Sequence, residues 1–250
     1  MKSGSISVAA PIRVRDRLAG AVDGPRDVLH ASASALYVDL DGWCLGLVSA
    51  SATRVPCALW STLGDLTPLA GRPVVVSGGA LVVGDAEVRI ARLVDPRLSS
   101  LGEEHPSLVE VPGASATSLE TTMSAIDLPA DGHLTEDHLD RLIGSGPGLT
   151  PLGDDVLAGW FATRAALGEP DPALAAATRE RLGATTLLSA TLLECAIRGE
   201  ALPQLAAWLT APTERTADAL LAVGATSGAG LMAGARLALT SLHDASRRAA

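Results

Sequence analysis

The strongest chemical signal in the sequence lies between residues 144 and 160, where a glycine-rich loop runs into an apolar segment. Gly146 and Gly148 flank a proline, and glycines allow unusual backbone dihedrals and close approach of the backbone to a ligand. Thr150 followed by Pro151 has the form of a helix N-cap and a proline at the first helical position. We therefore predict that Gly146, Gly148 and Thr150 bind a ligand where this helix begins.

Two adjacent carboxylates, Asp154 and Asp155, fall in the first turn of that helix, where the helix dipole stabilises negative charge. Free amides at a helix start attract anions, but two carboxylates at the same place would repel one. A magnesium ion would resolve this conflict, since it commonly bridges one or two carboxylates to a phosphate. We predict that both aspartates are catalytic and that, if a metal takes part, they hold Mg²⁺. The plainer alternative is a capped helix with two solvated acids.

A second glycine-rich turn, at residues 224–231, repeats this design without the acids. Thr226 or Ser227 is expected to cap the helix that follows, and no carboxylate lies in its first turn. Because the amides there are free to hold a phosphate or a carboxylate, we predict that Thr226, Ser227 and Gly228 bind an anion. The alternative is a capped helix that packs closely through its glycines.

Between the two loops, Thr185 and Ser189 are four residues apart, which places both hydroxyls on one face of a helix. These hydroxyls either contact a ligand or bond back to carbonyls of their own helix. Arg198 closes the segment, and we predict that its guanidinium is a catalytic clamp for a carboxylate or phosphate. A surface salt bridge is the alternative for this arginine.

Apolar periodicity and turn residues predict the helices that position these groups. The last of them carries Gly230 and Gly234, a pair that predicts close helix packing in a soluble chain. Thr135 is expected to cap the first of these helices. His133, Asp137 and His138 could suggest a metal site there, but their poor spacing favours a solvated helix face. The expected helices cover 133–143, 156–167, 172–198 with an interruption near Gly183, 203–210, 213–223 and 227–248.

The first part of the chain predicts β structure instead. Asp41-Gly42 is a strong signal for a two-residue hairpin between the apolar runs 35–40 and 43–48. A short amphipathic helix is expected at 11–22, and glycine turns separate three further strand-like runs, at 73–77, 80–83 and 86–94.

These patterns predict an α+β fold of two domains. Residues 1–115 are expected to form an N-terminal antiparallel β barrel or sandwich, and residues 116–250 a C-terminal helical domain that carries both glycine-rich loops. Residues 95–132 are rich in Pro, Ser, Thr and Gly, and we expect a connection there with one short helix.

Composition limits the partners. Of 250 residues 48% are hydrophobic and only 2% aromatic, so the core is built from Ala, Leu and Val. The net charge of -9 argues against nucleic acid or an anionic membrane surface as the main partner. Cys44, Cys57 and Cys195 form no CxxC pair and are predicted to be buried free thiols of a reducing compartment. No signal peptide or membrane span is evident, so we expect a cytoplasmic protein.

Three segments together resemble one bacterial family, which is named for the AllH-type subunit of oxamate carbamoyltransferase. The order and spacing of the segments match over roughly residues 140–240, whereas the N-terminal half is similar only in outline. The segments are Gly-Pro-Gly-Leu-Thr-Pro-Leu-Gly-Asp-Asp-Val-Leu-Ala-Gly at 146–159, Thr-Thr-Leu-Leu-Ser-Ala-Thr-Leu-Leu at 185–193 with Arg-Gly-Glu at 198–200, and Gly-Ala-Thr-Ser-Gly-Ala-Gly-Leu at 224–231.

The resemblance implies a role in anaerobic purine and allantoin breakdown. The family reaction moves a carbamoyl group between oxalurate and phosphate, giving oxamate and carbamoyl phosphate, and members of the family act alongside two other subunits. A small anionic substrate and protein partners are therefore expected. The chain departs from the family where Leu152 replaces a common Ser and where Ala225 replaces a usual His. If that histidine matters chemically, this member acts on another substrate or has a supporting role.

Two other classes of function stay open. As a non-catalytic subunit, the chain would use the same loops for packing and docking, and no nucleophile paired with a histidine is evident, since His105 and His243 lie far from the motifs in sequence. A magnesium-dependent phosphoryl-transfer or hydrolytic enzyme would use the same loops for chemistry.

Overall fold

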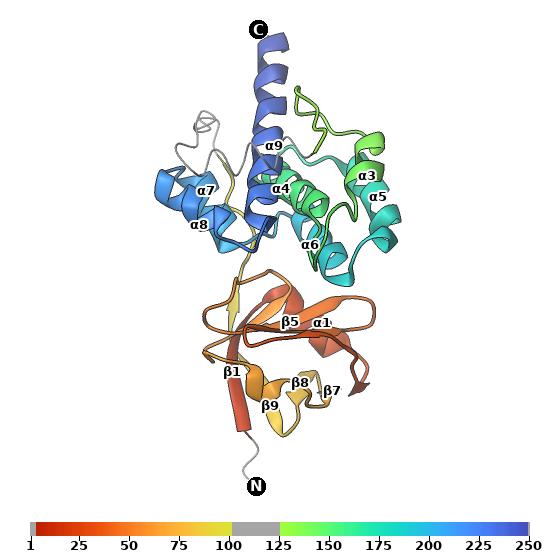
Figure 1. Ribbon diagram of the computed structural model, residues 1–250, viewed down its shortest axis with the longest axis vertical. Coiled ribbons are helices and arrows are strands. Elements are labelled where there is room, and N and C mark those ends of the chain that lie inside the picture. Colours follow the sequence, from red (N-terminus) through yellow and green to blue (C-terminus); the bar gives the residue numbers. More distant parts are fainter. Residues whose placement is uncertain (1–3, 102–125, 250) are drawn as a thin grey trace. The chain divides into compact units, whose positions relative to one another are not determined.

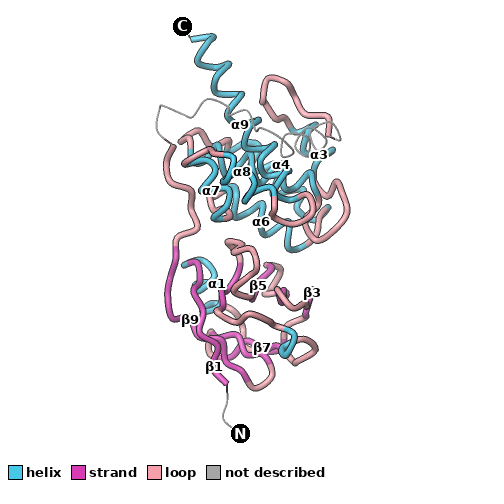
Figure 2. Tube along the Cα trace, turned by 60° about the vertical axis from the view of Figure 1, so that its left-hand side comes forward, coloured by secondary structure: helices cyan, strands magenta, loops and turns pink. Residues whose placement is uncertain are grey.

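A computed structural model describes residues 4–101 and 126–249 of the chain, which forms two compact units, Met1–Pro96 and Arg97–Ala250. The named strands lie in the first unit and the long helices in the second (Figure 2). The predicted α+β class is thereby confirmed. The predicted boundary between residues 115 and 116 lies outside the described residues. So does most of the connection in which a short helix is expected.

The first unit is one curled sheet, half a barrel, whose described strands follow the order β2-β7-β8-β9-β1-β6-β5-β4-β3. Most neighbours are antiparallel, but β1 pairs in parallel with β9, and β5 in parallel with β6. The predicted amphipathic helix is α1, which buries Val14 and Leu18. The elements are β1 (Gly4–Pro11), α1 (Ile12–Gly20), β2 (Gly24–Pro25), β3 (Val28–Ala31), β4 (Ala35–Asp39), β5 (Cys44–Val48), β6 (Ala58–Ser61), η1 (Thr67–Leu69), β7 (Val74–Ser77), β8 (Ala80–Val83) and β9 (Ala86–Val94).

The predicted hairpin joins β4 to β5 and is confirmed in detail. Leu40 and Trp43 exchange two backbone hydrogen bonds across a two-residue turn, at 2.8 and 3.2 Å. Asp41 and Gly42 both have positive φ, 55° and 79°, the conformation that the right-handed twist of the flanking strands favours. All three cysteines are buried thiols that form no disulfide, as predicted.

The second unit is helical, and its helices match the predicted segments closely. The segment expected at 172–198 is interrupted at η2, which contains Gly183. Among the described residues, no helix is long and apolar enough to span a membrane. The helices are α3 (Glu136–Leu142), α4 (Leu152–Ala166), α5 (Pro172–Arg181), η2 (Leu182–Ala184), α6 (Leu187–Ile197), α7 (Pro203–Thr210), α8 (Glu214–Leu221) and α9 (Ser227–Ala249).

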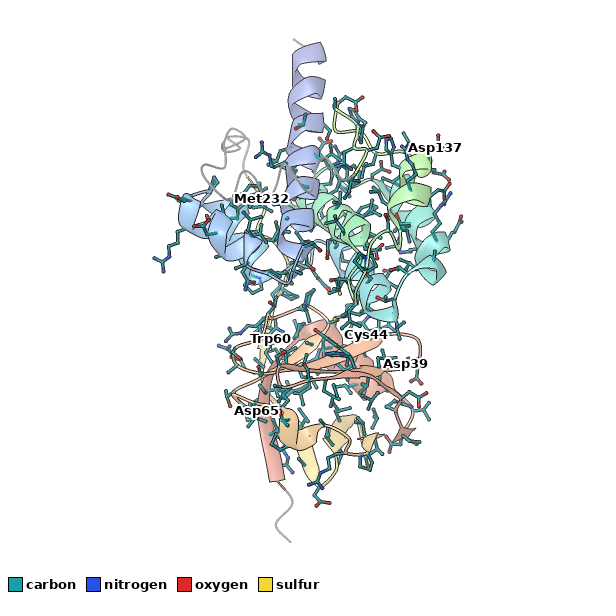
Figure 3. All side chains as sticks on the ribbon, viewed as in Figure 1. Asp39, Cys44, Trp60, Asp65, Asp137 and Met232 are labelled. Carbon is teal, nitrogen blue, oxygen red and sulfur yellow. The ribbon has the colours of Figure 1, made fainter. Side chains whose placement is uncertain are left out.

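Helix α4 is the centre of this unit and is buried on nearly every side from Gly153 to Thr163. It packs most extensively against α9 (Figure 1), and α6 and α3 also contact it. The predicted glycine packing is confirmed: a Cβ at Gly234 would lie 1.8 Å from the Val156 carbonyl oxygen. Met232, labelled on α9 in Figure 3, is fully buried. Both glycine-rich loops enter this helix pair at its N-terminal ends.

Candidate active site

The first loop enters α4 differently from the prediction. Helix α4 begins at Leu152, and Pro151 is its N-cap, with φ −53° and ψ 142°. The Pro151 carbonyl accepts hydrogen bonds from the amides of Asp154 and Asp155 at 3.0 and 3.2 Å. The prediction that Thr150 caps this helix is therefore wrong, because the extended ψ of Pro151 delays the helical turn by one residue. The Thr150 hydroxyl is left available for another partner.

That partner is Ser227, the first residue of α9, so the two glycine-rich loops meet. The Thr150 and Ser227 hydroxyl oxygens lie 2.9 Å apart. Ser227 also hydrogen-bonds the carboxyl group of Asp155. One turn further along α9, Gly230 packs on the same aspartate, since a Cβ there would lie 2.8 Å from the Asp155 Cβ. Thr150, Asp155 and Ser227 thus form one cluster from segments 77 positions apart in the chain.

Asp154 faces the other way and ties the first loop to α6. Its Oδ1 accepts the Gly144 amide at 2.9 Å, and its Oδ2 accepts the Thr185 hydroxyl. A hydrogen bond from Ser189 reaches the same carboxylate. Burial raises the pKa of Asp154, and these three hydrogen bonds act against that rise. Thr185 lies in extended backbone before α6 and only Ser189 lies on that helix, so the prediction that both share one helix face is wrong. Both hydroxyls are nevertheless directed at a carboxylate of the protein itself.

We expect Thr185→Val to loosen this anchor, because a hydrogen bond to a charged group contributes about 1.5–3 kcal/mol to stability. The measurement is the free energy of unfolding in urea, together with proteolysis of the loop at 144–150. Thr210→Val is the matched control, since within the described part of the chain the Thr210 hydroxyl bonds back to the Ala206 carbonyl of its own helix. Equal losses in the two variants would contradict the anchoring role.

Asp155 is the more unusual carboxyl group. The residue is 6% exposed, and its Oδ2 atom has no hydrogen-bond partner among the residues that the structure describes. Burial raises the pKa of Asp155 to about 8; the Ser227 hydrogen bond lowers it and the nearby charge of Asp154 raises it further. The group therefore holds its proton at neutral pH. The conflict between two carboxylates and an anion is eased by this proton, without a cation.

The aspartate pair does not fit a magnesium ion. Both oxygens of Asp154 already accept protein hydrogen bonds, and Asp155 carries a proton at neutral pH. Within residues 4–101 and 126–249, no group of three His, Cys, Asp or Glu residues could hold a metal. Magnesium binds deprotonated, accessible carboxylate oxygens, and this pair does not offer them.

The remaining predicted loop residues divide into exposed and packed ones. Gly146 and Gly148 are exposed and have positive φ, 118° and 99°, which few other residues tolerate. Thr226 is exposed, and its carbonyl accepts the Gly230 amide. Gly228 is buried: its amide donates to the Val223 carbonyl at 2.9 Å. The prediction that the amides of the second loop are free is therefore wrong for Gly228, because its turn closes on itself.

Arg198 is not brought to the cluster. It lies just beyond the C-terminal end of α6, whereas Thr185 and Ser189 lie at the beginning of that helix. Eleven helical residues span about 16 Å. The Arg198 side chain is 56% exposed and approaches Glu194 at 4.0 Å. The structure therefore matches the alternative prediction for Arg198, a salt bridge at the surface.

Sequence reasoning missed two residues that shape the site, Gly144 and Thr186. The Gly144 amide binds Asp154, while Thr186 caps α6 and donates its hydroxyl to the Leu149 carbonyl at 2.6 Å. Thr186 stands directly before the apolar run of α6, and that N-cap signal was present in the sequence. Gly144 opens the glycine-rich loop and has the positive φ, 73°, of a glycine after a helix, but no local signal predicts that its amide binds Asp154.

Comparison with known proteins finds a similarity in the part of the chain that carries these residues. Residues 142–239 match the family model described as oxamate carbamoyltransferase subunit AllH. The matched range contains the cluster of Thr150, Asp155 and Ser227, and also Gly144, which binds Asp154, and Gly230, which packs on Asp155. No curated protein and no solved structure matches the chain.

Proposed function

Because the chain belongs, through residues 142–239, to the family of oxamate carbamoyltransferase subunit AllH, we propose that it is a subunit of a carbamoyl-transferring enzyme. The reaction moves a carbamoyl group between oxalurate and phosphate, with oxamate and carbamoyl phosphate as the other pair, in cytoplasmic purine and allantoin breakdown. The three cysteines are buried thiols that form no disulfide, which fits a reducing compartment.

The meeting of the two glycine-rich loops carries this proposal. The Thr150–Ser227 hydrogen bond brings an exposed loop of flexible glycines against the start of a 23-residue helix. Helix starts favour anions, and the first turn of α9 has no acidic residue. The proton on Asp155 removes a negative charge from the same place. Small anions such as carbamoyl phosphate and oxamate fit this combination of hydroxyls, helix dipole and neutral carboxyl group.

Ligand-induced stabilisation tests the site on the purified chain. We expect carbamoyl phosphate or oxamate to raise the melting temperature, since a ligand at 100 times its Kd adds about 2.7 kcal/mol to the free energy of unfolding. Ser227→Ala is expected to reduce the shift, and Asp137→Asn, an exposed change on α3 (Figure 3), to leave it intact. Sulfate serves as the control for unspecific anion effects.

A docking subunit is the second candidate, and the packed glycines favour it. A Cβ at Gly228 would lie 1.9 Å from the Leu220 carbonyl oxygen, and one at Gly153 would lie 2.0 Å from that of Leu142. These glycines are required for helix packing whether or not a ligand binds. If no anion shifts the melting temperature, and the assembled complex keeps its turnover with Ser227→Ala, the docking role replaces the catalytic one. The third candidate, a magnesium-dependent reaction, gains no support, because Asp154 and Asp155 do not fit a magnesium ion.

A further inference from the structure

A chain of hydroxyl groups leads from the exposed loops to a buried carboxyl group. Thr150 and Ser227 are half-buried and within hydrogen-bond distance of each other, at 2.9 Å. Ser227 also bonds Asp155, whose Oδ2 atom is buried without a partner. Resting on the proposed function, we propose that Asp155 is the general acid that protonates the departing oxamate nitrogen, and that Ser227 and Thr150 carry the replacement proton.

The reaction requires such an acid. When an oxygen of hydrogen phosphate attacks the carbamoyl carbon of oxalurate, a C–O bond forms and the bond from that carbon to the oxamate nitrogen breaks. The nitrogen cannot leave as an amide anion at neutral pH, so it must take a proton as the bond breaks. Asp155 supplies this proton. The attacking hydrogen phosphate loses its own proton, which passes through the hydroxyls of Thr150 and Ser227 to Asp155. Atoms and charge balance without an oxidant, reductant or added proton.

The two aspartates have different roles because their hydrogen-bond partners differ. Asp154 accepts from Gly144, Thr185 and Ser189, and these bonds favour its charged form. It is a positioning residue, which holds the first loop and keeps a negative charge near Asp155. The Oδ2 atom of Asp155 is buried and accepts no hydrogen bond from the described residues, so no described protein group competes for its proton.

Within residues 4–101 and 126–249, the elements packed around Asp155 bring no competing acid or base to it. On its own helix, Asp154 is the charged group that acts on it. Helix α9 presents the Ser227 hydroxyl and has no ionisable residue from 227 to 235. The Thr185 and Ser189 hydroxyls bond Asp154. Helix α3 turns Leu139 and Leu142 inward, while Glu136 and Asp140 bond Arg181. A raised carboxyl pKa is what a general acid at neutral pH needs.

The kinetic test uses the intact complex purified with this chain. Asp155→Asn is expected to lower kcat by about 100- to 10,000-fold in both directions with little change in KM for oxalurate. Asp155→Glu restores part of the activity, and Ser227→Ala causes a smaller loss. In the complex with the unmodified chain, kcat for oxalurate phosphorolysis falls as pH rises through about 8, whereas the reverse reaction rises, because it needs Asp155 deprotonated. Asp137→Asn keeps both pH profiles.

A second measurement does not depend on turnover. With ¹³C-labelled aspartate in the isolated chain, one carboxyl carbon is expected to titrate near pH 8 and to disappear from the spectrum in Asp155→Asn. Titration of that carbon near pH 4, or a kcat of Asp155→Asn within a few-fold of the unmodified chain, overturns the general-acid role. A complex that transfers no carbamoyl group at all overturns the proposed function, and the titration then still reports whether Asp155 holds its proton.

Discussion

Gly234→Ala is expected to destabilise the helical unit by about 3 kcal/mol, near the upper end for overpacking a well-packed interior. Its Cβ would lie 1.8 Å from the Val156 carbonyl oxygen and 2.8 Å from the Trp160 amide nitrogen. Both are backbone atoms of α4, so the clash is relieved only by moving α9 away from α4. The separation would also draw Ser227 and Asp155 apart, and activity should fall with stability.

Urea unfolding followed by far-ultraviolet circular dichroism measures this effect. Gly183→Ala is the matched control in the same unit, because a Cβ there has nothing within 4 Å. We expect the control to unfold at the same urea concentration as the unmodified chain or slightly above it, since alanine restricts the unfolded state. If both variants unfold at the same urea concentration, α9 does not pack on α4 as closely as the contact between Gly234 and the Val156 carbonyl implies.

The helices were predictable because their limits are encoded locally. Pro203 begins α7, and the long segment is interrupted between α5 and α6 at the turn that contains Gly183, a residue of low helix propensity. The Asp41-Gly42 hairpin followed from the same kind of signal. The parallel pairing of β1 with β9 could not be predicted, because it joins strands more than 70 residues apart and no turn residue specifies it.

The site was predictable in its parts but not in its assembly. The motifs gave Asp154, Asp155 and Ser227, but the contact between Asp155 and Ser227 depends on how α9 packs on α4. The glycines that were predicted to contact a ligand fall into two groups in the structure. Gly146 and Gly148 are exposed, whereas Gly228 is buried and serves helix packing. Arg198 shares a motif with Thr185 in sequence, and a straight helix places them at opposite ends. Burial of a carboxyl group is a tertiary property, so the proton on Asp155 had no sequence signal.

The proton on Asp155 makes stability depend on pH. An aspartate in the unfolded chain loses its proton near pH 4, whereas the native pKa of Asp155 is raised to about 8, mainly by burial. Between these values the native state binds one more proton than the unfolded state. The free energy of unfolding therefore falls as pH rises, by about 1.4 kcal/mol per pH unit from this group. Burial raises the pKa of Asp154 too, which adds to the fall.

Asp155→Asn should remove the contribution of this group, because an amide does not titrate. We expect its free energy of unfolding to fall less steeply than that of the unmodified chain between pH 5 and 8, so that the variant gains relative stability as pH rises. Urea titrations at pH 5, 6, 7 and 8 measure the two slopes. Asp137→Asn, at an exposed position, should run parallel to the unmodified chain. Parallel slopes for Asp155→Asn would mean that Asp155 ionises in the folded protein as it does in the unfolded chain. A flatter slope combined with lost turnover would show that the chain keeps a destabilising carboxyl group because the reaction needs its proton.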